Sequence, residues 1–516
     1  MVFKQFHTGN KQLKPIRFLK TLNVIFFEKY NYQTIENMKH FFRLSSVILI
    51  LSTALFSSCK STGDQPETVA IDSTKLGTML EQYVAALDTT FKYELRDSVR
   101  GEGYTTYILY MESQRWLTTN EVDETLWWHW VSVTVPDEVV SDIGLLWIGG
   151  GSKNTEQPKD APGMLVQLAL YTKTVTAGLH NIPFQKLTFK GDDFGPRNED
   201  ALISYGWKKF IEGGGKDEDA IWLARLPMTK AAVRAMDAVS DFTKVNLSKD
   251  VSKYTVFGGS KRGWTTWTTA IVDKRVVAIA PVVIDMLNVV PSFERHWQAY
   301  GFWAPAVTDY VREGIMDRQY TEGYQKLISI TEPFSYRDRL TIPKFIINAS
   351  GDEFFLPDSW EFYYSELVGE KHLRYVPNAN HGLEGTDAPN SFSAFYKSIV
   401  DNTPRPDFNW SFSDGKLTIE TGDNKPDSIY FWQAFNPNAR DFRVETFGRN
   451  WEKEIIPTNW NGKYEMSVIT PEKGWKAFYA ELVFPGSGEV PFKFSTGIYV
   501  TPDSLPYPKY EPKASE

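Results

Sequence analysis

Residues 256–264 read VFGGSKRGW, an apolar run that ends on two glycines and continues into a helical pattern after a single serine, Ser260. A serine on a tight turn between a strand and a helix is typical of a nucleophile elbow, which lifts the hydroxyl above the sheet. The usual pattern is G-x-S-x-G; Gly258 and Ser260 fit it, but Arg262 occupies the place of the second glycine and Gly263 follows one position later. The sequence predicts a nucleophilic serine at an altered elbow.

A serine hydroxyl is a weak nucleophile and needs a base, usually a histidine that a carboxylate orients. His381 directly follows the strand-like run LRYVPNAN, and Asp352 ends the run KFIINASGD. The carboxyl ends of parallel strands meet at one edge of a sheet, and the order serine, aspartate, histidine is that of elbow enzymes. We predict the triad Ser260, Asp352 and His381, with Glu353 and Asp285 as alternative acids.

The remaining histidines are excluded by their order in the chain or by their predicted position. They are His7, His40, His129, His180, His296 and His372.

An oxyanion hole must accompany such a triad, because the developing negative charge needs preorganised donors. The backbone N–H of Lys261, directly after the serine, would provide one donor. Gly150 or Gly151, in the loop WIGGGS after an earlier strand, would provide the other. Glycines also make flexible turns, which is the alternative interpretation of this loop.

The surrounding pattern predicts an α/β architecture, in which a mainly parallel sheet has helices on both faces. Helical spacing is found at 199–207 and 220–239. About sixty residues, rich in aromatic side chains, separate two of the late strands and predict a cap inserted around 286–340. The predicted strands are 127–136, 143–151, 185–189, 254–259, 276–285, 344–352 and 373–382.

From about Thr403 the pattern changes to short strand-like runs between Asp, Asn, Gly and Pro turns. These runs are KLTIE, SIYFWQAF, FRVET, YEMSVI, WKAFYAELVF and PFKFSTGIYV. We therefore predict a small β-sandwich domain over 403–516. Its aromatic residues fit either a ligand site or the core of a domain that braces the catalytic one, and the second interpretation is preferred.

The N-terminal region has the design of an export signal. Residues 38–58 contain two basic residues, a short apolar stretch and then small residues, and Cys59, the only cysteine of the chain, follows. We expect a lipoprotein-type signal peptide and lipidation of Cys59, with an ordinary cleaved signal peptide as the alternative. Residues 1–37 are expected to be an over-called upstream start, and 59–86 a linker and N-terminal segment.

Composition excludes some classes of partner. The chain has 516 residues, 42% of them hydrophobic, and a net charge of −8, so it can bury large cores in two or three domains but presents no basic field for nucleic acid. The 17 Trp and 25 Tyr residues are expected mostly in cores. A serine triad needs no cofactor, and we expect no metal.

Several longer motifs indicate a family: GGSKRGWT, the GGG loop, LARLPMTKAAVRAMDA, APVVIDMLN, SGDEFF and PNANHG. Together they resemble the PhoPQ-activated pathogenicity-related proteins, a bacterial group, from about Leu87 to the C-terminal region. The resemblance implies an α/β-hydrolase-like fold, here over 87–402, and places Arg262 in this group's own form of the elbow. It also implies that Ser260, Asp352 and His381 match the presumed triad, and it says little about substrate.

These observations predict an exported serine hydrolase, anchored in the cell envelope by its lipid, that cleaves an ester or amide in a small-molecule or peptide substrate. Asp192 and Asp193, in FKGDDFGP, lie near the same sheet edge and would meet a cationic substrate group or cap a helix. Two alternatives stay open: a catalytically silent envelope or virulence factor that uses the fold as a binding platform, and a carbohydrate-binding or carbohydrate-esterase role.

Overall fold

The computed structural model describes residues 77–458 and 461–513. The predicted signal peptide, Cys59 and the upstream residues lie outside this part of the chain. Within the described residues, no helix is long and apolar enough to cross a membrane.

The centre of the molecule is a nine-stranded sheet that is parallel over its larger part. Strands β1, β2, β3 and β5 pair antiparallel, whereas β5, β4, β6, β7, β8 and β9 pair parallel. In spatial order the strands are β1 (Lys92–Gly101), β2 (Tyr104–Arg115), β3 (Leu126–Pro136), β5 (Thr176–Leu179), β4 (Ile143–Ile148), β6 (Lys253–Gly259), β7 (Val276–Val282), β8 (Lys344–Ala349) and β9 (Lys371–Val376). The predicted mainly parallel sheet is confirmed.

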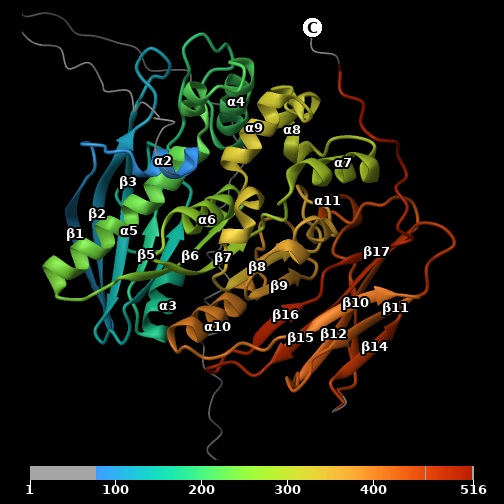
Figure 1. Cartoon of the computed structure of the whole chain (residues 1–516). Coiled ribbons are helices and arrows are strands. Elements are labelled where there is room, and N and C mark those ends of the chain that lie inside the picture. Colours follow the sequence, from blue (N-terminus) through green and yellow to red (C-terminus); the bar gives the residue numbers. More distant parts are fainter. Residues whose placement is uncertain (1–76, 459–460, 514–516) are drawn as a thin grey trace, which may run out of the picture.

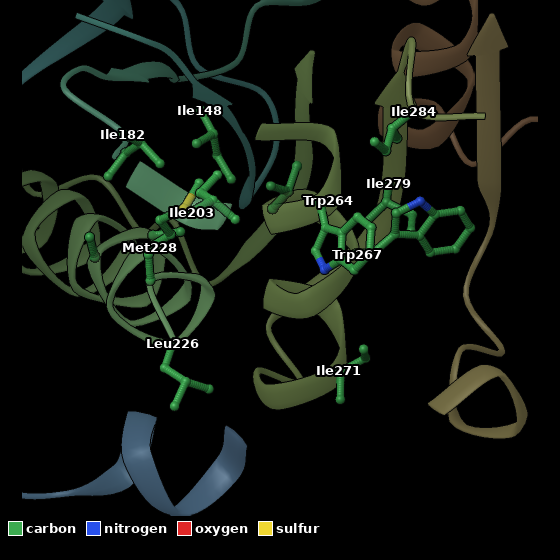
Figure 2. Close-up of a cluster of buried hydrophobic side chains, with 14 of the residues drawn as sticks. Ile148, Ile182, Ile203, Leu226, Met228, Trp264, Trp267, Ile271, Ile279 and Ile284 are labelled. Carbon is green, nitrogen blue, oxygen red and sulfur yellow. The ribbon is translucent and has the colours of Figure 1, made fainter. Parts of the chain in front are cut away.

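Helices cover both faces of this sheet (Figure 1). On one face lie α2 (Met79–Ala85), α5 (Arg225–Leu247) and α6 (Lys261–Val272), whose apolar side chains share one buried cluster. On the other face α3 (Gly163–Thr172) and α10 (Ala388–Val400) contribute to a second cluster. Helix α6 turns Trp264, Trp267 and Ile271 inward at helical spacing, each at most 7% exposed (Figure 2).

The segment between β7 and β8 is helical and lies over the C-terminal edge of the parallel strands, at the top of Figure 1, where the cap insertion was predicted. It contains α7 (Val289–Tyr300), α8 (Thr308–Arg312) and α9 (Glu322–Thr331), and α4 (Glu199–Glu212) packs against α8 and α9. The same segment contains three short 3₁₀ helices, η3 (Pro305–Val307), η4 (Met316–Arg318) and η5 (Pro333–Arg339). Three more lie outside it: η2 (Asp217–Trp222) between α4 and α5, and η6 (Ser359–Phe362) and η7 (Tyr364–Glu366) between β8 and β9.

The C-terminal region forms a separate β domain of two antiparallel sheets, drawn in orange and red in Figure 1. One sheet has the order β10 (Asn409–Ser413), β11 (Lys416–Glu420), β14 (Lys463–Ser467). The other has β13 (Glu452–Ile456), β12 (Ser428–Asn436), β15 (Trp475–Phe484) and β16 (Phe492–Ser495), with β17 (Tyr499–Thr501) also paired to β15.

Three element predictions were wrong or incomplete. QKLTF at 185–189 is not a strand and makes only isolated bridges, because the next strand is the short TAGL segment, β5. FRVET contributes to the one-turn helix α11 (Val444–Phe447) instead of a strand. The hairpin of β1 and β2 was missed, since β1 is mostly exposed and polar and gives no apolar alternation.

Candidate active site

Ser260 stands on the sharp turn between β6 and α6, with φ 56° and ψ −124°, a backbone conformation that is costly for a residue with a side chain. The turn is tight enough that a Cβ on Gly258 would lie 2.8 Å from the carbonyl oxygen of Arg262. A Cβ on Gly263 would lie 2.8 Å from the Ile284 side chain and 3.1 Å from the carbonyl oxygen of Val282. The displaced glycine of the motif therefore lets α6 pack directly against β6 and β7.

Asp352 and His381 are brought together from the ends of β8 and β9. Nδ1 of His381 lies 2.9 Å from Oδ2 and 3.1 Å from Oδ1 of Asp352. The side chain of Asp352 is only 4% exposed, and that of His381 13%. The ring of Phe354 lies 4.4 Å from the imidazole, so one face of the base is screened from water. This arrangement fixes the tautomer of the imidazole and leaves Nε2 for an external proton.

Ser260 opens into a cavity of about 40 Å³ that also touches the neighbours of His381. Phe354 and Phe355 line this cavity, and both rings contact the imidazole. Among the described residues the Ser260 hydroxyl has no hydrogen-bond partner; in unliganded hydrolases such contacts are often long and close only when substrate binds. Ser260 lines this cavity and the Asp352–His381 pair does not; Phe354 and Phe355 lie between them, lining the cavity and contacting the imidazole.

The two alternative acids occupy other environments. Asp285 is buried and accepts hydrogen bonds from Tyr363 Oη at 2.6 Å and Tyr375 Oη at 2.5 Å. Burial raises the pKa of Asp285 to about 7. Glu353 accepts the backbone N–H of His381 at 2.9 Å, and burial together with the Asp352 charge raises its pKa. Glu353 therefore contacts the backbone of His381 and Asp285 contacts two tyrosines, and neither carboxylate is hydrogen-bonded to the imidazole among the described residues.

Among the other described histidines, His129, His296 and His372 have hydrogen-bond partners, whereas Nε2 of His180 is buried and has none among the described residues. His129 is buried between Ser113 and the carbonyl of His180. Burial lowers the pKa of both His129 and His180 to about 4 and that of His296 to about 3, so that these rings are neutral near pH 7. His372 lies 2.8 Å from a carboxylate oxygen of Glu370.

The loop that follows β4 carries the predicted oxyanion glycines. The carbonyl of Gly150 accepts from the Asn181 N–H at 2.8 Å, and the carbonyl of Gly151 accepts from Gln185 Nε2 at 2.8 Å. Neither glycine N–H, nor that of Lys261, has a partner among the described residues. Gly151 has φ +136°, and a Cβ there would lie 2.4 Å from Asn181 Oδ1, so only glycine fits this position.

The side chains of Lys261 and Arg262 form a network that the sequence reading missed. Lys261 Nζ lies 2.9 Å from Glu199 and 3.1 Å from Asp200, at the start of α4. Arg262 binds Glu199 at 2.5 Å and the Ile182 carbonyl at 2.5 Å. Burial opposes ionisation of Glu199, but the charges of Arg262 and Lys261 outweigh it and hold its pKa well below the usual range.

This network explains the altered elbow. Glu199 also accepts a hydrogen bond from Gln185 Nε2 at 2.6 Å, and the same nitrogen holds the Gly151 carbonyl. Arg262 therefore links the turn that carries the serine to the loop that carries the glycines. The sequence signal was an acidic pair at one helix start and a basic pair at another, but only the tertiary structure reveals that they meet.

Asp192 and Asp193 have different surroundings. Asp192 is bound at 2.5 Å and 3.0 Å by Arg197, which in turn pairs with Glu313 at 2.7 Å. Asp193 is exposed. Neither residue lines the cavity beside Ser260.

The C-terminal domain touches both loops that carry the acid and the base. The Asn378 side chain donates to the Trp451 carbonyl at 3.1 Å and accepts from the Trp451 N–H at 2.9 Å, and Arg449 donates to the Asn378 carbonyl. The Val444 N–H donates to the carbonyl of Gly351, next to Asp352, at 2.9 Å. The β domain therefore contacts the loops of Asp352 and His381 from outside the main sheet.

Within the described part of the chain, no group of three or more His, Cys, Asp or Glu residues is arranged to hold a metal ion.

The order of the parallel strands, the elbow between β6 and α6, and the helical insertion after β7 define the chain as an α/β-hydrolase-like protein with an added β domain. The chain belongs to the family of the PhoPQ-activated pathogenicity-related protein, whose model matches residues 80–443. It is also 37% identical over 461 residues to the Autocrine proliferation repressor protein A of Dictyostelium discoideum. The aligned region covers 83% of this chain and 92% of that protein.

Among solved structures, the chain is similar to an acetyl xylan esterase from Paenibacillus sp. R4, with 16% identity and a TM-score of 0.44 over 63% of this chain and 92% of that one. It is also similar to the Pyrococcus horikoshii acylaminoacyl peptidase, with 13% identity and a TM-score of 0.36 over 63% of this chain and 51% of that one. Because both TM-scores are below 0.5, the fold assignment stands on the strand order and connections described above.

Proposed function

We propose that the protein is a serine hydrolase that cleaves an ester or amide of a small molecule or peptide. The proposal is supported by the buried Asp352–His381 pair and by a serine held in a strained elbow turn, whose cavity is lined by the two phenylalanines that contact the His381 imidazole. Strained serines paired with an oriented imidazole are characteristic of acyl-transfer sites.

In this mechanism Ser260 Oγ attacks the carbonyl carbon of the substrate while Nε2 of His381 accepts the hydroxyl proton. Asp352 holds the imidazole and stabilises its charged form. The N–H groups of Lys261 and of Gly150 or Gly151 bind the oxyanion.

The tetrahedral intermediate then collapses, and the protonated His381 gives its proton to the leaving alcohol or amine. Water, deprotonated by the same imidazole, attacks the acyl-serine and releases the acid, which regenerates Ser260.

A fluorophosphonate probe tests this proposal directly, because it labels only activated serines. We expect wild-type protein to be labelled, Ser260→Ala to lose labelling, and Ser335→Ala, which alters an exposed serine, to retain it. Absence of labelling in folded wild-type protein would refute the proposal.

A second candidate is a binding or signalling role without catalysis. The name of the Dictyostelium discoideum relative describes repression of proliferation and not hydrolysis, which favours this alternative. It predicts that the wild-type protein and Ser260→Ala are equally active in a binding or growth assay and equally unreactive toward the probe.

We further propose that the protein is exported and anchored in the cell envelope through a lipid on Cys59. The support is the sequence of residues 38–59, an apolar stretch followed by small residues and the only cysteine of the chain.

A further inference from the structure

The cavity beside Ser260 has one polar end and otherwise apolar walls. Its apolar lining comes from α4, from α6, from the segment between β7 and β8, and from the loop after β8. Asp200, Arg225, Lys261 and Tyr310 form the polar part, and the apolar residues are Trp207, Trp264, Ile284, Met286, Val289, Phe293, Val307, Phe354 and Phe355.

Arg225 is the unusual member of this set, because no carboxylate of residues 77–458 or 461–513 forms a salt bridge with its buried guanidinium. The residue is 3% exposed, and one of its nitrogens, NH1, donates to the Lys261 carbonyl at 2.8 Å. Its Nε has no hydrogen-bond partner, and the guanidinium stacks over the Trp264 ring at 4.6 Å. Burial lowers the pKa of Arg225, and the nearby Tyr310 and Asp200 act in the opposite direction.

The acidic residue of the cavity is already engaged. Asp200 binds Lys261 at 3.1 Å through Oδ2 and accepts from the Tyr310 hydroxyl at 3.2 Å through Oδ1. Glu199 is engaged by Lys261 and Arg262. Of the three charged residues that line the cavity, Asp200 and Lys261 therefore pair with each other, and Arg225 is the third.

We propose that Arg225 binds a carboxylate of the substrate, at the end of a short apolar segment that fills the cavity beside Ser260. A guanidinium is always charged and suits a planar carboxylate, and burial strengthens such a pair. The volume of about 40 Å³ limits the apolar segment to a few carbons. This inference rests on the proposed hydrolase function and names its substrate class: half-esters or half-amides of short dicarboxylic acids.

The first test compares two substrates that are matched in size and differ in charge, monoethyl glutarate and diethyl glutarate. We expect the wild type to hydrolyse the monoester with the higher kcat/KM. In Arg225→Gln the ratio of the two kcat/KM values should fall roughly 10- to 100-fold, as for loss of a charged hydrogen bond. Arg225→Lys should recover part of the ratio. A wild type that prefers the diester overturns the proposal, whether or not the Arg225 variants fold.

The second test measures binding without turnover, so that it separates this inference from the hydrolase proposal. Trp207 and Trp264 line the cavity and report occupancy by fluorescence. In Ser260→Ala, monoethyl glutarate should change the emission and bind more tightly than the diester. If the monoester binds more tightly but wild-type Ser260 is not labelled by the fluorophosphonate probe, only the hydrolase proposal is refuted. If the wild type is labelled and active but both esters bind equally well, only the role of Arg225 is refuted.

Discussion

Nδ1 of His381 lies within 3.1 Å of both carboxylate oxygens of Asp352, so the proposed base has a fixed orientation before any substrate arrives. The ring of Phe354 packs 4.4 Å from the imidazole, and the same ring lines the cavity into which Ser260 opens. This relationship carries the first prediction.

Asp352→Asn should lower kcat for an ester substrate by roughly 10³- to 10⁴-fold, because the amide favours the wrong tautomer of His381. Steady-state kinetics with a chromogenic ester measures the loss. Glu353→Gln, which still offers an oxygen to the His381 N–H, is the matched control and should lose less than about tenfold. Equal losses in the two variants would contradict the assignment of the acid.

Removal of Arg262 should destabilise the protein, because it leaves Glu199 partly buried with one cation fewer. We expect Arg262→Met to lower the free energy of unfolding by roughly 2–4 kcal/mol. Urea denaturation followed by tryptophan fluorescence measures it. Arg312→Met breaks a more exposed pair with Asp309 and should cost less than about 1 kcal/mol. A small loss in Arg262→Met would show that the network does not hold the elbow.

The buried Asp285 should make the protein less stable as the pH rises. Its pKa is raised from 3.8 unfolded to about 7 in the fold, so the folded state binds the extra proton between these values. Below pH 3.8 the carboxyl is protonated in both states. Between pH 3.8 and about 7 it ionises only in the unfolded state, so the free energy of unfolding falls as the pH rises. Above about pH 7 it is ionised in both states, and the loss of stability is constant. The full shift corresponds to about 4 kcal/mol.

Asp285→Asn should remove this dependence, since the amide keeps an acceptor for one tyrosine and never ionises. Urea midpoints at pH 5, 6, 7 and 8 for the variant and the wild type provide the measurement. Glu332 and Glu361 also have pKa values raised to about 7 and act in both proteins, so the difference between the two curves isolates Asp285. If the urea midpoints of the wild type and Asp285→Asn changed with pH in the same way, Asp285 would not be a buried, protonated carboxyl in the folded state.

Loss of the contact between Asn378 and Trp451 should lower kcat more than the same substitution at an exposed asparagine does. Asn378 has φ 54°, which glycine tolerates, so Asn378→Gly removes the two side-chain hydrogen bonds without adding backbone strain. We expect kcat to fall roughly tenfold, as the His381 loop loosens. Asn402→Gly changes an exposed asparagine with φ 51° and serves as the control; the same fall in both variants would contradict a bracing role.

Cys59→Ser should abolish incorporation of a fatty-acid label and release the protein from the membrane fraction. Growth with an alkyne-tagged fatty acid, followed by fractionation, measures both. Retention of the label in the variant would exclude Cys59 as the lipid site.

The sequence predicted the parallel half of the sheet because β6, β7, β8 and β9 are short apolar runs that end in glycine or polar residues. It missed the β1–β2 hairpin, because β1 consists mostly of exposed residues. It also predicted a strand at QKLTF and none at the four-residue β5. Local pattern cannot distinguish a short buried strand from a buried loop when both are apolar.

At the site, chain order was enough to choose His381 and Asp352, since both follow strands whose ends share one edge. The partners of Arg262 and the unpaired Arg225 could not be predicted in the same way. Both depend on helices α4, α5 and α6 meeting in space, and no local spacing encodes that meeting.

The contacts from Trp451 to Asn378 and from Val444 to Gly351 join loops that are made early in synthesis to residues that are made late. The ribosome makes the serine, the acid and the base well before residues 444–451, which fasten the last two in place. A chain that ends before residue 444 would carry every residue of the proposed triad and lack these contacts to the loops of Asp352 and His381. The β domain therefore gives the proposed site a dependence on residues that are made last.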